Sequence, residues 1–308
     1  MTGGGQGSPY DGGMATNPVF GRLITAMVTP FTPDGALDLA AARRLARYLV
    51  EVQHNDALLI NGTTGEAPTT SDAEKSALVA AVKDELGSAA LIIAGVGTFD
   101  TRHSVELAKQ AEQAGADGLL IVTPYYSLPP QSAIIAHFET VADATPLPCI
   151  LYDIPHRAGR PIETASLIAL AAHPRIVAVK DAKKDLVASA QVIAATGLAY
   201  YAGDDAVTLP LLSVGGVGVV GTATHFTGAR MKDLIEAFLA GRVEEATARN
   251  AALLPVSTGV FATQGCMLVK AGLHHRGLLP QSGLRPPMQS ATAAEATAFA
   301  ALLDALES

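Results

Sequence analysis

The chain of 308 residues contains no tryptophan and only two cysteines, and its aromatic side chains make up 5% of the residues. The two cysteines, Cys149 and Cys266, stand in apolar surroundings and form no CxxC or other metal-binding pattern, so we expect core thiols. The histidines show no metal-binding spacing such as HExxH. The sequence therefore predicts no metal site.

Long apolar runs, an excess of basic charge and a leader segment are also missing. No uninterrupted apolar run reaches about 18 residues, the length that a membrane-spanning helix needs. Only 16% of the residues are charged, and the formal net charge of −8 disfavours a nucleic-acid partner. Residues 1–14 lack the basic flank and apolar core of a signal peptide. These absences predict a soluble, cytoplasmic protein with neither a membrane nor a nucleic-acid partner.

Apolar sequence in short blocks is abundant. Hydrophobic residues make up 49% of the chain, which is enough for one large core. Most blocks are continuous rather than alternating, as parallel strands covered on both faces require. We predict eight strands, at residues 23–29, 57–61, 91–96, 118–123, 149–154, 176–180, 198–203 and 217–222.

Segments with apolar residues at helical spacing separate these strands, and Ser71 or Asp72 caps one of them. Eight strand–helix units over about 200 residues predict a (β/α)8 TIM barrel of the α/β class, with a doubly wound sheet as the alternative. From about residue 227 the pattern is helical only. We expect a disordered glycine-rich tail (1–17, with Met14 as an alternative start), the barrel (18–226) and a C-terminal helical region packed on it (227–308).

The apolar run IVAVK, residues 176–180, ends on a lysine. In water this amine has a pKa of about 10.4, and an apolar strand end would lower that pKa. The active site of such a barrel lies at the carboxyl ends of the strands, where a neutral amine forms Schiff bases with ketones and aldehydes. The alternatives for Lys180 are a side chain that extends to the rim, or one that pairs with Asp181 or Asp185.

Other polar residues follow neighbouring strands. Tyr152 stands near the end of the fifth strand, where a phenol can relay the protons that imine chemistry requires. GTTGE, residues 62–66, offers two hydroxyls and backbone N–H groups suited to a carboxylate, and Arg157 offers a bidentate fork for a second one. The alternative for GTTGE is an ordinary glycine turn, and the alternative for Arg157 is a surface ion pair.

Two glycine-rich stretches do not fit nucleotide-binding motifs. GTTGE lacks the GK[ST] ending of a phosphate-binding P-loop. GVGVVG, residues 216–221, matches GxGxxG, but its glycines lie inside the apolar run instead of between a strand and a helix. The sequence therefore favours close backbone approach at the end of the eighth strand over a dinucleotide site.

Taken together, the motifs GTTGE, TPYY, YDIP, VKDA and GDDA resemble those of the dihydrodipicolinate synthase / N-acetylneuraminate lyase family of pyruvate-dependent aldolases. They occur in the family's order and spacing, and the resemblance spans about residues 20–300. It implies a (β/α)8 barrel with C-terminal helices and a homotetramer arranged as a dimer of dimers. It also implies that no metal or organic cofactor is needed.

The resemblance implies roles for individual residues. Lys180 resembles the lysine that forms the Schiff base with pyruvate, and Tyr152 resembles the central tyrosine of the proton relay. Thr63 resembles the threonine that links this relay, and Tyr126 the tyrosine contributed by the neighbouring subunit. The substrate-binding positions are Thr64 for the pyruvate carboxylate, Arg157 for the second substrate, and the main-chain carbonyls of Gly203 and Val220.

Arg157 decides between branches of the family, because the synthases of lysine and diaminopimelate biosynthesis resemble this chain in placing arginine there. We therefore expect a lyase that condenses pyruvate with L-aspartate 4-semialdehyde to 4-hydroxy-tetrahydrodipicolinate. His156 and the pair Ala67–Pro68 depart from the usual pattern. The alternatives are a sister aldolase for a sugar-derived 2-keto acid, and a catalytically silent barrel that binds a keto acid or a partner protein.

Some members of the family are inhibited by lysine at a dimer interface. Lys75 places a cation where some sensitive enzymes have histidine, and His103 stands where they have a carboxylate. Both changes disfavour a cationic ligand, by like charge and by loss of an ammonium partner. We therefore expect weak or absent feedback by lysine.

Overall fold

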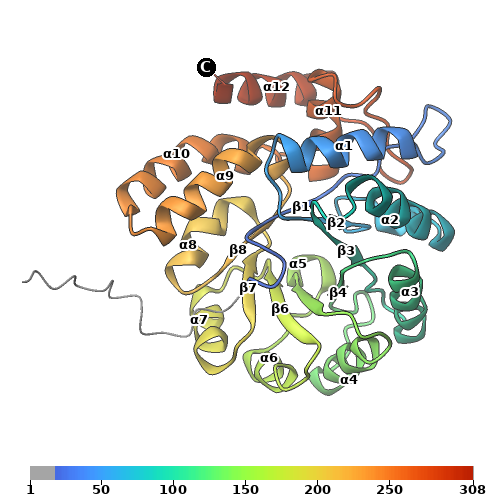
Figure 1. The fold of residues 1–308 in the computed structure, drawn as a ribbon, viewed down its shortest axis with the longest axis vertical. Coiled ribbons are helices and arrows are strands. Elements are labelled where there is room, and N and C mark those ends of the chain that lie inside the picture. The colour runs from blue at the N-terminus through green and yellow to red at the C-terminus, as the bar shows by residue number, and fades with distance from the viewer. Residues whose placement is uncertain (1–17, 308) are drawn as a thin grey trace, which may run out of the picture.

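Eight parallel strands close into a barrel in the order β1 to β8, as Figure 1 shows for the computed structural model, which describes residues 18–307. The tail expected at residues 1–17 lies outside the described residues. The strands are β1 (Leu23–Ala26), β2 (Ala57–Ile60), β3 (Leu91–Gly95), β4 (Gly118–Val122), β5 (Cys149–Asp153), β6 (Ile176–Asp181), β7 (Ala199–Ala202) and β8 (Gly218–Gly221).

Pairing between the first and last strands closes the sheet. Ile24 of β1 lies opposite both Ala57 of β2 and Val220 of β8. A doubly wound open sheet has no such pairing, so the predicted (β/α)8 barrel is confirmed and the alternative is excluded.

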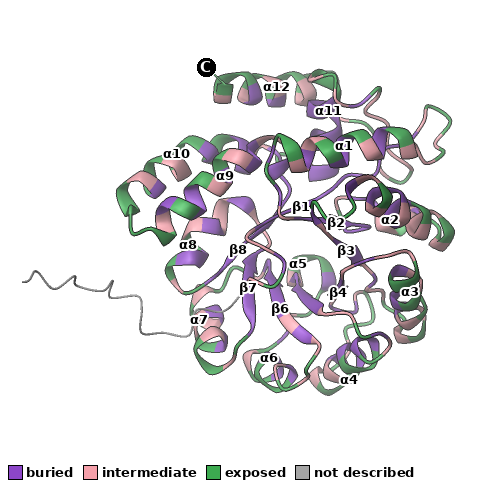
Figure 2. Ribbon diagram, viewed as in Figure 1, coloured by how far each residue is buried: buried purple, intermediate pink, exposed green. Residues whose placement is uncertain are grey.

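Burial on both faces explains why these sequences form strands of a barrel. One set of buried side chains, including Ile24, Leu59 and Ala178, fills the interior, and a larger set lies between the strands and the helices. Figure 2 shows the strands as almost uniformly buried and the outer helix faces as exposed. Several predicted strands are too long: β1 ends at Ala26, although the following residues to Thr29 remain buried. Continuous apolar sequence therefore marks burial rather than the end of sheet pairing.

Helices alternate with the strands and surround the barrel (Figure 1). The predicted cap of one of them is confirmed, because the Ser71 side chain accepts from the backbone N–H of Glu74 and the Glu74 side chain accepts in return. The helices are α1 (Leu39–Glu51), α2 (Asp72–Leu86), α3 (Thr101–Gln113), α4 (Gln131–Ala142), α5 (Pro155–Ala158), α6 (Thr164–Leu170), α7 (Leu186–Ala195), α8 (Thr208–Ser213) and α9 (Thr224–Leu239).

Beyond β8 the described chain is helical, with α10 (Val243–Gly259), α11 (Gly265–His275) and α12 (Ala293–Glu307) following α9. Helix α9 packs against β1 and β8 and completes the barrel, so we propose that the C-terminal region begins after α9 rather than at residue 227. Every residue of α11 from Gly265 to Leu273 is buried, which makes α11 the central helix of this region. None of the helices within residues 18–307 is long and apolar enough to cross a membrane.

Two histidines are buried in the packed layers. His225 lies in α9, with Nδ1 2.8 Å from the Thr222 carbonyl and Nε2 3.2 Å from the backbone nitrogen of Val28. His137 lies in α4, with Nδ1 2.9 Å from the Thr101 hydroxyl, and its Nε2 has no hydrogen-bond partner among the described residues. Burial lowers the pKa of each imidazole to about 4.

These histidines should make the protein less stable in mild acid. Each has a lower pKa in the folded state than its unfolded value of about 6.5, so between pH 6.5 and 4 the unfolded chain binds more protons. The free energy of unfolding, measured by urea titration, should fall as the pH drops through this window. In His137→Leu the slope against pH should be smaller by about 1.4 kcal/mol per pH unit, because one titrating group is removed. An unchanged slope would show that His137 is not held neutral.

Candidate active site

A cavity of about 280 Å³ opens at the carboxyl ends of β5 to β8. Its walls come from the β2, β5, β6, β7 and β8 ends and from the segment between α10 and α11. The lining residues are Thr63, Thr64, Tyr152, Ile154, His156, Arg157, Lys180, Ala182, Lys184, Gly203, Asp204, Thr222, Phe261, Thr263 and Gln264.

Lys180 is only 5% exposed and lines the cavity. In the register of the sheet it stands directly opposite Tyr152 of β5 and Tyr201 of β7. Its Nζ lies 4.3 Å from the centroid of the Tyr152 ring. Burial lowers the pKa of Lys180 to about 8, the nearby Asp205 carboxylate opposes this shift, and Arg157 adds to it. At neutral pH about one amine in ten is then unprotonated and nucleophilic.

Tyr152 of β5 is 5% exposed, lies opposite Val122 of β4 and Lys180 of β6, and lines the cavity. Burial raises the pKa of its phenol, while Arg157 and a hydrogen bond with Thr63 act in the opposite direction. The phenol therefore holds its proton at neutral pH, and it has Thr63 as a hydrogen-bond partner at the cavity. A protonated phenol beside an amine is suited to proton exchange with a group bound at that amine.

The loop after β2 carries Thr63 and Thr64 into the cavity. It folds as consecutive turns, in which the Gly65 N–H donates to the Gly62 carbonyl at 3.0 Å and the Glu66 N–H donates to the Thr63 carbonyl at 3.1 Å. The Thr64 hydroxyl lies 3.3 Å from the Thr222 hydroxyl at the end of β8. The loop thus brings two hydroxyls to the cavity that Lys180 also lines, where a carboxylate of a bound substrate can accept hydrogen bonds.

Basic side chains gather on the outer wall in spite of the formal net charge of −8. Arg157 is exposed at the cavity, and its Nη2 donates to Gln264 Oε1 at 2.9 Å. His156 and Lys184 line the same wall, and Lys184 pairs with Asp204 at 2.5 Å. Burial, with help from Arg157 and Lys184, lowers the pKa of His156. This wall favours an anionic ligand.

Asp205 supports the cavity from behind. Its buried carboxylate accepts from the Thr222 N–H at 2.9 Å and from the Thr224 N–H at 3.2 Å. Burial raises the pKa of this carboxyl, and backbone hydrogen bonds from Thr222 and Ala223 act against the rise. Asp205 therefore fixes the end of β8. Its carboxylate also favours the charged form of Lys180 and so opposes the lowering of the Lys180 pKa.

The structure brings six of the eight predicted site residues to this cavity: Lys180, Tyr152, Thr63, Thr64, Arg157 and Gly203. Val220 is instead buried among the apolar side chains of the barrel interior. Tyr126 lies outside the cavity, 93% exposed and with a φ of 73°, while its neighbour Tyr125 packs edge-on against Phe99.

Within residues 18–307 no group of three or more His, Cys, Asp or Glu side chains is arranged to hold a metal ion.

Sequence reasoning missed Gln264 and Phe261, which line the cavity from the segment before α11. Gln264 is 107 residues from the arginine that it contacts. No local pattern marks either residue, since only the packing of the C-terminal helices on the barrel brings them there.

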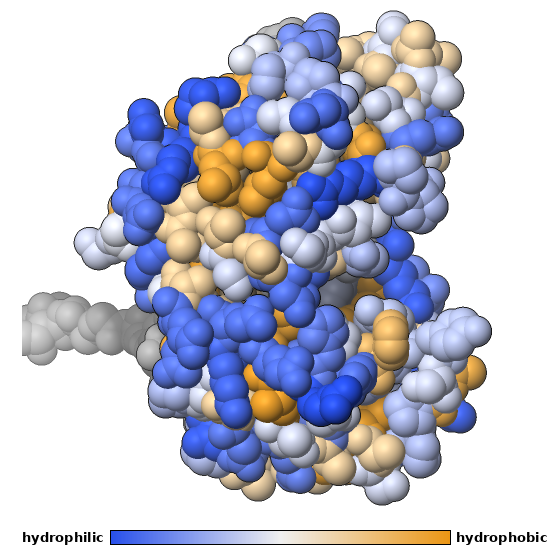
Figure 3. Space-filling model, turned by 90° about the vertical axis from the view of Figure 1, so that its right-hand side faces the viewer, coloured by the Kyte–Doolittle hydropathy of each residue, from blue (hydrophilic) through white to orange (hydrophobic). Residues whose placement is uncertain are grey.

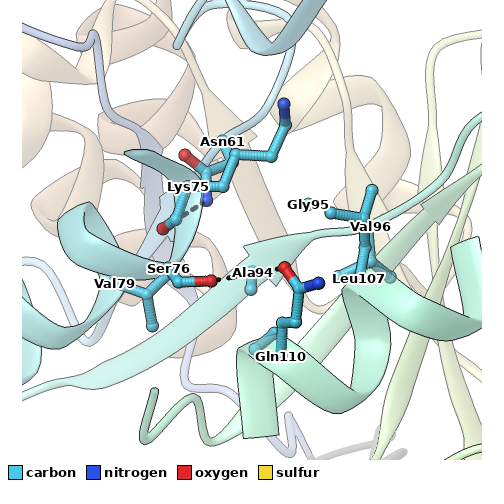
Figure 4. Close-up of a pocket in the computed structure, with 10 residues that line it drawn as sticks. Asn61, Lys75, Ser76, Val79, Ala94, Gly95, Val96, Leu107 and Gln110 are labelled. Carbon is cyan, nitrogen blue, oxygen red and sulfur yellow. Dashed lines mark hydrogen bonds between the residues drawn. The ribbon is translucent and has the colours of Figure 1, made fainter. Parts of the chain in front are cut away.

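A second cavity, of about 440 Å³, adjoins the first and shares Thr63 and Tyr152 with it. Lys75, Asp72 and His103 line it, and His103 Nε2 lies 2.9 Å from Asp72 Oδ2. Figure 4 shows Lys75 at the small pocket beside it, with its ammonium group pointing away from the hydrogen bond between Ser76 and Gln110. Burial lowers the pKa of Lys75.

The chain is similar over nearly its whole length to known proteins. A sequence model described as the Dihydrodipicolinate synthetase family matches residues 19–306. The 4-hydroxy-tetrahydrodipicolinate synthase of Cutibacterium acnes is 60% identical over 287 residues, which are 93% of this chain and 98% of that protein. The enzyme of the same name from Acidothermus cellulolyticus is 59% identical over 274 residues, 89% of this chain and 88% of that protein. The crystal structure of DHDPS from Cyanidioschyzon merolae with lysine bound is 39% identical, with a TM-score of 0.91, covering 94% of this chain and 98% of that one.

Reductive alkylation by a small aldehyde and cyanoborohydride should distinguish Lys180 from surface lysines. Because burial lowers its pKa to about 8, its rate should rise about tenfold per pH unit up to pH 8 and then level off. The exposed Lys109 serves as the internal reference in peptide mass spectrometry. Arg157→Gln removes a neighbouring cation and should move the Lys180 profile to higher pH. A Lys180 profile that coincides with that of Lys109 would contradict the lowered pKa.

Proposed function

This chain belongs to the dihydrodipicolinate synthetase family, and from that premise we propose how its cavity performs the reaction. The chain is a lyase that condenses pyruvate with L-aspartate 4-semialdehyde to 4-hydroxy-tetrahydrodipicolinate, a step of lysine and diaminopimelate biosynthesis. The assignment of individual residues to steps of this reaction is our proposal. The observation that supports it best is the buried Lys180 amine, 4.3 Å from the Tyr152 ring.

In the first step the unprotonated amine of Lys180 attacks the keto carbon of pyruvate, and water leaves as a Schiff base forms. The lowered pKa of Lys180, about 8, supplies the neutral amine at physiological pH. The Thr64 hydroxyl and the neighbouring backbone hold the pyruvate carboxylate, and the main chain at Gly203 lines the same cavity. These groups follow different strands, β2 and β7, so the barrel positions the substrate.

Proton transfer then converts the imine to an enamine. Tyr152 holds a proton beside Lys180, and its hydrogen bond with Thr63 connects the phenol to the loop after β2. We assign to Tyr126 of a neighbouring subunit the next position in this relay, because Tyr126 is too exposed in its own chain to act there. The relay removes a methyl proton of the imine and later returns a proton for release of the product.

The second substrate enters on the basic wall. Arg157 binds the carboxylate of aspartate semialdehyde through two parallel N–H groups. The planar guanidinium matches the geometry of a carboxylate, so both hydrogen bonds can form at once. The enamine carbon attacks the aldehyde carbon, and the amine of the semialdehyde closes the ring as Lys180 is released. Gln264, 2.9 Å from Arg157, holds the guanidinium at the cavity before the substrate arrives. Two anionic substrates thus meet at Lys180 and Arg157.

The role given to Tyr126 requires an oligomer, and we propose a homotetramer built as a dimer of dimers in the cytoplasm. Phe99, Tyr126 and Leu128 are exposed apolar or aromatic side chains on segments that follow β3 and β4. Burial of such side chains in a subunit interface is favourable. Figure 3 shows one face of the chain, on which apolar side chains form small patches between polar ones.

A coupled assay tests the proposed reaction. The protein is mixed with pyruvate, aspartate semialdehyde, excess dihydrodipicolinate reductase and NADPH, and the loss of NADPH is followed. Wild-type protein should turn over, and Lys180→Ala should be inactive because no imine forms. Arg157→Ala should raise the KM for aspartate semialdehyde by about tenfold or more, since a charged hydrogen-bond partner is lost, with little effect on the KM for pyruvate.

Arg44→Ala is the control, because Arg44 is an exposed arginine of α1 that does not line the cavity. It should leave both KM values unchanged. Wild-type protein that shows no turnover, yet is labelled at Lys180 by borohydride with pyruvate, would identify a sister aldolase with another acceptor. A wild-type protein without turnover or label would identify a silent barrel.

The second cavity lies where lysine would act if this chain were inhibited like some members of the family. Lys75 provides a cation there, and the Asp72 carboxylate is already engaged by His103 at 2.9 Å. An incoming ammonium group would therefore meet a like charge and an occupied carboxylate. These contacts support the proposal that lysine binds weakly.

Submillimolar L-lysine should therefore leave the coupled activity of the wild-type protein unchanged. The double variant Lys75→His/His103→Glu removes the cation and adds a carboxylate, so it should gain inhibition by lysine. Lys109→His, on the exposed face of α3, is the control and should stay insensitive. Strong inhibition of the wild-type protein would refute this reading of the cavity.

A further inference from the structure

A buried ion pair outside the cavity joins the C-terminal helices to the loop that carries Thr63 and Thr64. Lys270 of α11 and Glu66 at the end of this loop are 1% and 3% exposed, and Lys270 Nζ lies 2.5 Å from Glu66 Oε1. Lys270 Nζ also donates to the Gly283 carbonyl at 2.9 Å. The other oxygen of Glu66 accepts from the backbone N–H of Arg285 at 3.0 Å. Every polar end of the pair therefore has a partner, as burial of two charges requires.

Glu66 also has an unusual backbone conformation. Its φ of 56° and ψ of 38° place it in the left-handed region, which a residue with a side chain rarely adopts. Such a conformation persists where the surrounding structure fixes it, and it is often found at functional sites. The same residue donates its N–H to the Thr63 carbonyl at 3.1 Å. The conformation of Glu66 therefore sets the course of the turn that presents Thr63 and Thr64 to the cavity.

The surroundings of the pair are closely packed and hydrogen-bonded. Phe31 contacts both cations, with its ring centroid 4.3 Å from Lys270 Nζ and 4.2 Å from Arg285 Cζ. The Arg285 side chain donates to the Thr69 carbonyl at 2.8 Å and pairs with Glu74 at the start of α2. On its inner side the loop is held by the Thr29 hydroxyl, which donates to the Gly65 carbonyl at 2.6 Å. Lys270 thus belongs to a network of contacts that connects Glu66 to Phe31, to Arg285 and, through Arg285, to the start of α2.

We infer that Lys270 and Glu66 are positioning residues for pyruvate, which act by holding the Thr63–Thr64 turn in its binding geometry from outside the cavity. This inference rests on the proposed function of the cavity. Neither residue lines the cavity, so neither touches a substrate. Loss of the pair should loosen the hydroxyls and backbone that bind the pyruvate carboxylate, while Lys180, Tyr152 and Arg157 stay in place on other elements.

The test measures pyruvate binding apart from turnover. Protein is treated with borohydride at increasing pyruvate concentration, and the labelled fraction of Lys180 gives a half-saturating concentration. Glu66→Gln, which keeps the shape of the side chain, and Lys270→Met should each raise this concentration by about tenfold. Maximal labelling, kcat at saturating pyruvate and the KM for aspartate semialdehyde should stay close to those of the wild-type protein.

Lys83→Met is the matched control, because Lys83 of α2 forms an ion pair with Asp117 at 2.8 Å before the start of β4, at the opposite end of the barrel. It should not change the half-saturating concentration. If Lys270→Met fails to fold, the half-saturating pyruvate concentration of the milder variant Glu66→Gln tests the inference.

Two negative results can be told apart. Variants that have a lower melting temperature but an unchanged half-saturating concentration would show only structural support and would overturn the inference, leaving the proposed function intact. A wild-type protein that pyruvate and borohydride do not label at Lys180 would overturn the proposed function itself.

Discussion

Desolvation of the Lys180 amine is the constraint on which the barrel mouth depends. The carboxyl end of β6 places this side chain among apolar and aromatic neighbours. The charged form of the amine is disfavoured there because it loses its hydration. Asp205 and the face of the Tyr152 ring offset part of this cost, whereas Arg157 adds to it. The balance leaves an amine that is neither permanently charged nor permanently neutral. Both its nucleophilic attack and its later release in the proposed reaction need such an intermediate pKa.

The C-terminal helices help to form the carboxyl-terminal end of the barrel, where the cavity lies, because they contact two of the loops there. The residue before α11, Gln264, holds Arg157, and Lys270 within α11 holds Glu66. Both contacts reach loops at the carboxyl ends of strands, where a barrel has little other support. Because α11 is buried from Gly265 to Leu273, it cannot shift without disturbing the packing around it. Helix α11 and the residue before it thus contact two loops around the proposed substrate site.

Much of the fold and part of the candidate site were predictable from the sequence. The parallel strands followed from continuous apolar runs, and the cap at Ser71 followed from its spacing to Glu74. Lys180 and Tyr152 were predicted to lie near one another because consecutive strands of such a barrel are neighbours, and the sheet pairs them directly. The strand ends were less predictable, because residues such as Met27 and Val28 stay buried after β1 has ended.

The sequence by itself determined the parts of this protein that depend on short-range order: alternating strands and helices, the cap of α2, and a lysine at the end of an apolar strand. Only the tertiary structure decided which distant residues complete the site, namely Gln264 beside Arg157 and Lys270 beside Glu66, which are 107 and 204 residues apart. The reason is physical. Local patterns report hydrogen bonds and burial within one element, whereas these contacts depend on the path of the chain between elements. The buried pair is stable only because folding excludes water and supplies partners for each charge.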